Sequence, residues 1–244
     1  MSQSKDELHC FQFKQIATIE SPYKEKFAIP RQPNLVSAAK GKVILVGEAN
    51  DKELVRDIEK FSHLWLVFVF HGTQDQGWKP LVRPPRLGGN KKTGVLATRS
   101  TFRPNPIGMS VIKLDKVTVE KRQTILHISG LDLLDGTPII DIKPYIPYSD
   151  AITDAKGGFA QTAPYSGISV SFSEQAQADL SQYQTGYSEL ALLIEQVLSQ
   201  DPRPAYKHGK VDDKVYGMQL FDLNIQWAFK SLESISVLNI TQLT

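Results

Sequence analysis

Short apolar runs bounded by turn residues dominate the first 150 residues and predict β-strands. Leu64–Phe70 is a continuous β-favouring run, which is typical of a strand buried on both faces. Asn50 and Glu53 have the spacing of a helix N-terminus, so a short helix is predicted over Asp51–Lys60. The predicted strands are Phe11–Glu20, Lys42–Val46, Leu64–Phe70, Val95–Thr98, Ser110–Glu120, Thr124–Ser129 and Pro138–Ile142. Because little helix separates them, an all-β barrel or sandwich is expected.

The pattern changes after about residue 165. Ser188–Gln200 repeats apolar residues at helical spacing and predicts an amphipathic helix. Strands are predicted within Lys214–Phe229 and over Ser234–Ile240. We therefore expect a mainly β protein, with a β-rich N-terminal domain over residues 10–165 and a smaller C-terminal α+β domain over residues 166–244.

Composition excludes several classes of protein. Cys10 is the single cysteine in 244 residues, which rules out an intrachain disulfide and a cysteine-based zinc site. His63 and His71 flank one predicted strand and lie too far apart to share a metal ion, so no metal is expected. The longest apolar run is far shorter than the ~20 residues of a membrane helix. The N-terminus has no apolar leader segment, so a cytoplasmic protein without a membrane partner is expected.

Charge is strongly segregated along the chain. Residues 76–114 contain eight Lys or Arg and no Asp or Glu, and because the whole chain carries +2, the remainder carries −6. A long basic stretch in a nearly neutral protein favours a polyanionic partner, and nucleic acid is the first choice. The alternative is a solvated loop with incidental basic side chains.

Three segments are dense in residues that bind ligands, namely Tyr23–Pro33, Arg99–Ser110 and Gly130–Tyr148. Proline-braced loops that carry Arg, Asn, Gln and Asp are one way in which a scaffold positions polar groups. The sequence has no phosphate-binding P-loop, no GxGxxG after a strand and no nucleophile elbow. The common hydrolase, kinase and dinucleotide-binding classes are therefore disfavoured.

The chain resembles the TsaA/YaeB family, the TrmO-type tRNA methyltransferases, over essentially its whole length. The resemblance lies in six ordered motifs: SPYKEKFAIPRQP, FSHLWLVFVFH, RPPRLGGN, ATRSTFRPNPIGMS, LDLLDGTPIIDIKPY and DPRPAY. It implies an N-terminal antiparallel β-barrel that binds S-adenosylmethionine near the interface of a homodimer. It also implies methylation of N6 of N6-threonylcarbamoyladenosine, the modified base next to the anticodon of threonine tRNA.

Within this resemblance, three groups of side chains are candidates for the cofactor site and the chemistry. The expected cofactor contacts are Pro30, Arg31, Gln32, His71, Gly72, Arg99, Leu131, Asp132, Leu133 and Leu134. Asp132 and Asp141 are the candidates for the base that removes the proton from the exocyclic nitrogen. The alternatives are a loop-bracing role for Arg31, a strand-end role for His71, core packing for the leucines, and turn or ion-pair roles for the two aspartates.

A further set of basic and aromatic residues is predicted to bind tRNA. Some of them lie in the C-terminal domain, which is expected to form a second part of the tRNA-binding surface. The set comprises Arg83, Arg86, Lys91, Lys92, Arg103, Arg203, Tyr206 and Lys207. For Arg103, a role in loop structure or in the cofactor site is an open alternative. Two other functions remain: a methyltransferase that uses S-adenosylmethionine on another substrate, and a non-catalytic RNA-binding barrel.

Overall fold

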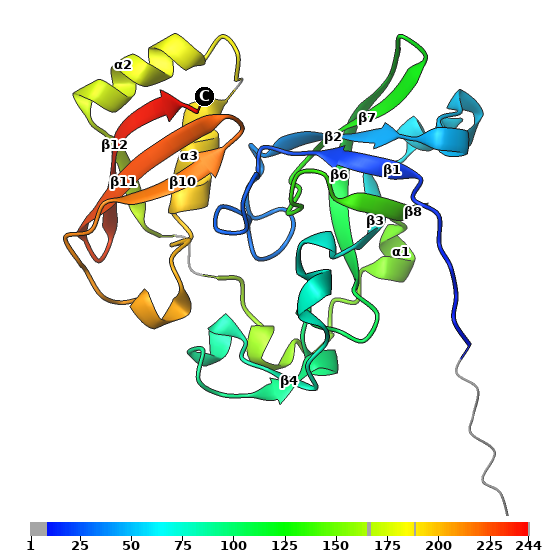
Figure 1. Cartoon of the computed structure of the whole chain (residues 1–244), viewed down its shortest axis with the longest axis horizontal. Helices are drawn as coiled ribbons and strands as arrows, with labels where there is room; N and C mark the ends of the chain where they lie inside the picture. Colours follow the sequence, from blue (N-terminus) through cyan, green and yellow to red (C-terminus); the bar gives the residue numbers. More distant parts are fainter. Residues whose placement is uncertain (1–8, 165–166, 188, 244) are drawn as a thin grey trace, which may run out of the picture.

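Two β-sheets, each from one part of the chain, form the body of the protein in the computed structural model, which describes residues 9–164, 167–187 and 189–243 (Figure 1). The first sheet is a closed barrel in the order β1-β2-β7-β6-β3-β8, and all its pairings are antiparallel. Its strands are β1 (Ala17–Glu20), β2 (Lys40–Leu45), β3 (His63–Val69), β6 (Ile107–Glu120), β7 (Gln123–Ser129) and β8 (Pro138–Pro144). The expected mainly β architecture is thus confirmed.

The barrel core follows from the alternation of side chains along its strands. In β3, Leu64, Leu66 and Phe68 point inward and are buried, whereas Trp65 and Val67 are half-buried on the outer face. The prediction that this strand is buried on both faces is wrong, because no layer of helices covers its outside within the described residues. The outward Trp65 instead packs against Tyr145, with ring centroids 5.8 Å apart.

Three predicted elements take other forms. Asp51–Lys60 forms two 3-10 turns, η2 (Lys52–Val55) and η3 (Ile58–Lys60), because Asp57 adopts a left-handed φ of 67° that interrupts an α-helix. Val95–Ala97 is a 3-10 turn (η6) rather than a strand. The strand predicted over Phe11–Glu20 is shorter than expected, since residues 11–16 lie outside β1. Just before Val95–Ala97, a two-stranded antiparallel ribbon pairs β4 (Leu81–Val82) with β5 (Thr93–Gly94). The other short helices are η1 (Gly47–Ala49), η4 (His71–Gln76), η5 (Pro85–Leu87), α1 (Pro147–Asp150), η7 (Gly158–Ala160) and η8 (Ala205–Lys207).

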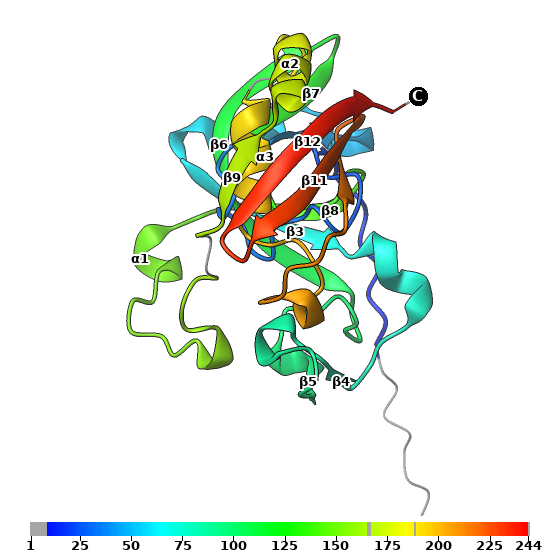
Figure 2. The same ribbon diagram turned by 90° about the vertical axis from the view of Figure 1, so that its left-hand side faces the viewer.

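The second sheet is built from the C-terminal part of the chain and packs against two helices (Figure 2). Its order is β10-β11-β12-β9, with β9 parallel to β12. The elements are β9 (Ser169–Phe172), α2 (Glu174–Tyr183), α3 (Leu190–Leu198), β10 (Tyr216–Leu220), β11 (Leu223–Ser231) and β12 (Ser234–Gln242). The α+β character expected here is confirmed, and α3 buries the predicted apolar face. Position 188 and the predicted domain boundary at 165–166 lie outside the described residues.

The segment between β1 and β2 is held by the second sheet and by α3. The N–H of Phe221 donates to the carbonyl of Pro22 at 2.7 Å, and Tyr23 forms an isolated antiparallel bridge with Leu220. From α3, the Gln196 side chain accepts from the Ala38 N–H at 2.9 Å. The C-terminal part therefore fixes the loop that carries the first of the three polar segments.

In the described part of the chain, no helix combines the length and the apolar character needed to cross a membrane.

Gly108, in the second polar segment, is required by close packing. A Cβ at this position would lie 2.4 Å from the Phe68 ring and 2.8 Å from the Phe70 ring. We predict that Gly108→Ala lowers the free energy of unfolding by about 1–3 kcal/mol, because the two packed rings must move. Gly94→Ala is the control, since its Cβ would meet nothing within 4 Å, and it should change stability by less than about 0.5 kcal/mol in the same urea titrations. Equal losses for both variants would contradict the packing argument.

Candidate active site

The first and third polar segments are joined by main-chain hydrogen bonds. The N–H of Asn34, the residue after the first segment, donates to the carbonyl of Gly130 at 2.8 Å, and the N–H of Asp135 donates to the carbonyl of Tyr23 at 2.9 Å. The Asp135 carboxylate accepts from the Ser21 N–H at 2.8 Å and pairs with Lys24 at 2.6 Å. Asp135 is thus a structural residue that locks the two segments together at the end of the barrel.

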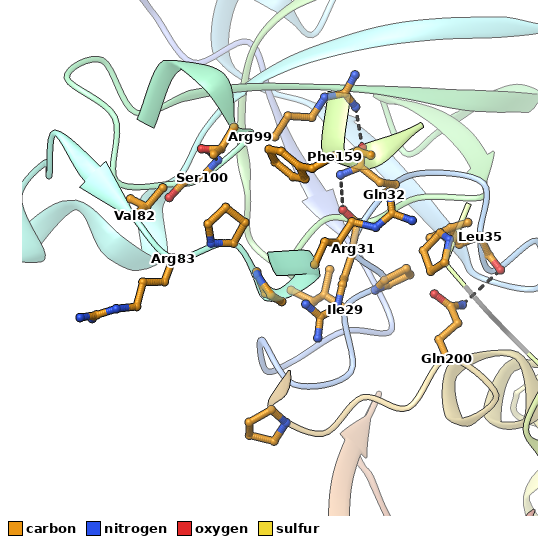
Figure 3. A pocket seen from close by; sticks show the side chains of 18 of the residues that line it. Ile29, Arg31, Gln32, Leu35, Val82, Arg83, Arg99, Ser100, Phe159 and Gln200 are labelled. Carbon is orange, nitrogen blue, oxygen red and sulfur yellow. Dashed lines mark hydrogen bonds between the residues drawn. The ribbon is translucent and has the colours of Figure 1, made fainter. Parts of the chain in front are cut away.

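The second polar segment is attached to the first through Arg99 and Gln32. Arg99 Nη1 donates to Gln32 Oε1 at 2.6 Å, and Gln32 Nε2 donates to the Arg31 carbonyl at 2.5 Å (Figure 3). Arg103 Nη1 donates to the carbonyl of Thr98 at 2.8 Å, so Arg103 braces its own loop. The structure therefore brings Arg31, Gln32 and Arg99 together.

Asp132 is the titratable group at the centre of this junction. Ser110 Oγ donates to Asp132 Oδ1 at 2.5 Å. Burial raises the pKa of Asp132 to about 6, although the Ser110 hydrogen bond and the nearby positive charge of Arg99 oppose the change. The group therefore titrates close to neutral pH, which is the range in which a carboxylate is an effective general base.

Asp141 occupies a different environment from Asp132. It neighbours Val67 in the sheet register, and Val67 neighbours the exposed Met109 on the outer face of the barrel. Its carboxylate pairs with Lys143 at 2.6 Å, and both side chains are largely exposed. Asp141 thus lies on the outward register of β8, whereas Ser110, the partner of Asp132, is buried, and the role of Asp141 as a base stays a prediction.

His71 and Gly72 follow β3 and open η4 beside the third segment. The Gly72 carbonyl accepts from Lys26 Nζ at 2.9 Å, and a Cβ on Gly72 would lie 3.6 Å from Leu134 Cδ2. The next residue, Thr73, has a buried hydroxyl with no hydrogen-bond partner among the described residues. This end of the barrel thus combines a half-buried apolar side chain, an exposed lysine and an unpaired hydroxyl.

The leucines of the third segment differ in what they can offer to a ligand. Leu131 and Leu133 are 0% and 2% exposed and belong to the core, so their side chains are not available as contacts. Leu134 is half-buried and lies beside Gly72. The cofactor prediction is therefore corrected for the Leu131 and Leu133 side chains, whose positions leave only main-chain groups for binding.

A cleft of about 2110 Å³ lies between the barrel loops and the C-terminal part. Arg31 and Gln32 line it from the first segment, and Phe159 lines it from the strand-free connection between the two sheets (Figure 3). Burial lowers the pKa of the Arg31 guanidinium, Asp201 opposes this change, and the positive charge of Arg86 adds to it. The cationic side chains that line the cleft are Lys26, Arg31, Lys79, Arg83, Arg86, Lys92, Arg99, Lys156 and Arg203.

The predicted tRNA contacts divide into accessible and inaccessible groups. Arg83, Arg86, Lys91 and Lys92 are exposed, and all but Lys91 line the cleft. Tyr206 is 70% exposed and shares a smaller cavity of about 340 Å³ with Arg31 and Arg83. Lys207 is half-buried, and its Nζ bonds to Asp212 and to the Tyr216 hydroxyl at 3.0 and 2.8 Å.

The prediction of Arg203 as a tRNA contact is corrected, because this side chain is only 1% exposed. Its Nε and Nη2 donate to the two Asp201 carboxylate oxygens at 2.8 Å, and Nη1 donates to the Lys210 carbonyl at 2.9 Å. The guanidinium also lies 3.7 Å from the centre of the Phe229 ring. Arg203 therefore organises the loop that presents Tyr206.

Several residues at the site were not singled out by the sequence. Lys26 and Ser110 lie inside the motifs, but spacing along the chain does not indicate that Ser110 bonds to Asp132 or that Lys26 bonds to Gly72. Phe159 lies outside the motifs. Among the described residues, no three His, Cys, Asp or Glu side chains gather closely enough to bind a metal ion.

Comparisons with known proteins agree over most of the chain. The tRNA-methyltransferase O N-terminal domain matches residues 18–151, and the TrmO C-terminal domain matches residues 166–243. A tRNA (adenine(37)-N6)-methyltransferase of Escherichia coli is 52% identical over 217 residues, covering 89% of this chain and 92% of that protein. A putative S-adenosylmethionine-dependent methyltransferase of Pseudomonas aeruginosa is 46% identical and covers 92% and 95%. The crystal structure of TrmO from P. aeruginosa superposes with a TM-score of 0.81 at 41% identity, covering 96% and 99%.

The raised pKa of Asp132 predicts a cost to stability at neutral pH. Folding moves this pKa from 3.8 to about 6, so between these pH values the folded state holds a proton that the unfolded state has released. The free energy of unfolding therefore falls as the pH rises through this interval. Asp132→Asn should therefore be more stable than the wild type by up to about 3 kcal/mol at pH 7 and gain little near pH 4. Urea unfolding across this range tests it, with Asp141→Asn as the control. A constant difference at every pH would contradict it.

The two neighbouring C-terminal side chains should separate folding from binding. Arg203→Ala leaves the Asp201 carboxylate buried without its partner and should cost about 3–5 kcal/mol of stability. Tyr206→Ala removes an exposed ring and should leave the melting temperature nearly unchanged while weakening tRNA binding. Calorimetry and filter binding distinguish the two effects, and a stable Arg203→Ala protein would refute the structural role.

Proposed function

This chain belongs to the tRNA-methyltransferase O family, and we propose that it is an S-adenosylmethionine-dependent tRNA methyltransferase. Its substrate is proposed to be N6-threonylcarbamoyladenosine next to the anticodon of threonine tRNA, methylated at N6. The observation that carries the proposal is the hydrogen bond that joins Arg99 of the second polar segment to Gln32 of the first, both of which line a cationic cleft. Asp132 of the third segment is near enough for the positive charge of Arg99 to lower its pKa. The names of the E. coli and P. aeruginosa relatives support the reaction and the cofactor.

The residues at the barrel end fit S-adenosylmethionine. This cofactor supplies a methyl group from a sulfonium centre and presents adenine, ribose hydroxyls and a carboxylate. The buried unpaired hydroxyl of Thr73 is a donor without a partner in the described structure, and half-buried Leu134 offers apolar surface beside the preceding residue, Gly72. Arg99 and Arg31 suit the carboxylate, since a guanidinium holds it with two hydrogen bonds. We propose that these groups, with Pro30, Gln32, His71, Gly72 and the Asp132 main chain, bind the cofactor.

Asp132 is the proposed base. The exocyclic nitrogen loses its proton as it gains the methyl group, and Asp132 Oδ2 is the oxygen to which Ser110 does not donate. At neutral pH the carboxylate is ionised, because its pKa of about 6 lies below the ambient pH. Holding the nitrogen and methyl group in line supplies much of the rate, so the loop bracing by Asp135 and Arg103 matters as much as the base.

The cleft is the proposed tRNA site. The target base lies in a single-stranded loop and can be splayed out without opening a helix. Arg83, Arg86, Lys91 and Lys92 are exposed and suit phosphate contacts, and Tyr206 suits stacking. The Lys207 charge is compensated by Asp212, so its contribution should be smaller.

We propose the organisation that accompanies this function. The cofactor-binding domain is residues 10–165, and the C-terminal domain, residues 166–244, contributes to tRNA binding by presenting Tyr206 in the smaller cavity that it shares with Arg83. A homodimer is proposed, with the outward aromatic and apolar side chains of the barrel, such as the 53% exposed Met109, as available surface. The expected location is the cytoplasm, where its tRNA substrate is found.

Methyl transfer to the modified tRNA is the direct test. Purified protein is incubated with S-adenosylmethionine and threonine tRNA that carries the threonylcarbamoyl group, and the digested nucleosides are weighed by mass spectrometry. One added methyl on that nucleoside is expected, with none on an unmodified transcript. Asp132→Asn should reduce the single-turnover rate about 10²–10⁴-fold, whereas Asp141→Asn should not.

The controls separate this proposal from its alternatives. Cofactor binding without methylation of this nucleoside would indicate a methyltransferase with another substrate. Binding of tRNA without binding of S-adenosylmethionine would indicate an RNA-binding barrel and contradict the proposal.

A further inference from the structure

The connection between the two sheets forms one wall of the cleft. Residues 156–164 line the cleft without a break, although residues 151–163 are exposed and none of them belongs to the buried core. Among the contacts that hold this stretch, the Arg86 guanidinium donates to the Thr162 carbonyl, and the Gly157 N–H donates to Gln161 Oε1. The connection is therefore attached along the cleft without being part of the core.

The part of the connection that lines the cleft combines an aromatic ring with a positive charge. Phe159 is the one aromatic residue between positions 151 and 164, and it is 41% exposed. Figure 3 shows Phe159 among the residues that line the cleft with Gln32 and Arg99. Lys156 lines the same cleft, and residues 156–164 contain no Asp or Glu. A polyanion in the cleft thus meets a cation and an apolar ring on this wall, and no acidic side chain.

The two other phenylalanine rings that line the cleft are already engaged by the protein. Phe27 is half-buried and packs against the hydrophobic core. Phe102 is half-buried as well, and Lys79 Nζ lies 4.6 Å from the centre of its ring, so a cation covers one of its faces. Phe159 is therefore the most exposed of the three rings.

An exposed apolar ring in a cationic cleft suits an unpaired nucleobase. Proteins that bind single-stranded nucleic acid combine a positive groove for the backbone with aromatic side chains on which bases stack. The bases of an anticodon loop can be splayed out so that their ring faces become accessible, whereas the bases of a duplex are stacked on one another. The ring and the charge of the cleft therefore match the loop of a tRNA better than its stems.

We propose that Phe159 stacks on an unpaired base of the tRNA anticodon loop. This inference rests on the proposed function, in which the cleft binds tRNA. The Lys and Arg side chains of the cleft contact phosphates, which every RNA carries, whereas the Phe159 ring requires a base that is out of its stack. The connection between the sheets thus takes a direct part in distinguishing a loop from a duplex.

The test compares how the full-length wild type and its variants bind the anticodon stem–loop of threonine tRNA and an RNA duplex of equal charge. Phe159→Ala should weaken stem–loop binding by about 5- to 150-fold, because one stacked base is lost, and should leave duplex binding unchanged. Phe159→Trp should bind within a few-fold of the wild type, whereas Phe159→Leu, which keeps an apolar side chain without a ring, should not. The melting temperatures should stay the same, since residue 159 lies outside the core.

Two controls separate stacking from other effects. Ile152→Ala removes a 68% exposed apolar side chain from the same connection, at a position that does not line the cleft, and should bind like the wild type. The salt dependence separates the ring from the cations. Arg83→Ala should reduce the slope of log affinity against log salt concentration by about one, whereas Phe159→Ala should leave this slope unchanged.

The failures of the two proposals are distinguishable. If the wild type methylates its tRNA but Phe159→Ala binds the stem–loop as tightly as the wild type, the role of Phe159 is refuted and the proposed function stands. If Phe159→Ala weakens S-adenosylmethionine binding and not stem–loop binding, the ring contacts the cofactor and the inference is wrong. If the wild type transfers no methyl group, the proposed function fails, and the binding measurements still decide the role of Phe159.

Discussion

The hydrogen bonds that hold the segment between β1 and β2 are the constraint on which the rest of the site depends. On one side this segment is tied to the third polar segment through Asn34–Gly130 and Tyr23–Asp135, and on the other it is tied to the C-terminal sheet through Pro22 and Phe221. These are mainly main-chain bonds, so their geometry tolerates little movement. Because the same segment carries Arg31 and Gln32, the two halves of the chain and the candidate site are assembled by one set of contacts.

This arrangement places two contrasting electrostatic environments next to each other. The cleft gathers exposed Lys and Arg side chains and suits a polyanion. The Asp132 side chain, in contrast, is half-buried, and burial raises its pKa more than Ser110 and Arg99 lower it. A strongly basic surface alone would keep a carboxylate ionised and weakly basic. Burial at the barrel end is what allows Asp132 to titrate near neutral pH beside so much positive charge.

The sequence predicted the architecture better than the roles of single side chains. Alternation and turn residues predicted the mainly β first half and the α3 helix, because burial on one face dictates both patterns. They did not predict the left-handed Asp57 that breaks the expected helix, or the turn at Val95–Ala97, since the spacing of apolar residues does not specify the backbone angles of single positions. Motif resemblance likewise located Arg203 and Asp141 but not their orientation. One is buried against Asp201 and the other faces outward with Lys143.

The central claim is that three segments distant in sequence form one cofactor site at the end of the barrel. Hydrogen–deuterium exchange with and without S-adenosylmethionine tests it most directly, because exchange reports protection of each segment. The account predicts slower exchange in the peptides that contain residues 23–34, 71–73, 99–110 and 130–137, with little change in residues 169–187 and 223–242. Protection confined to the C-terminal sheet, or to one of the three segments alone, would contradict it.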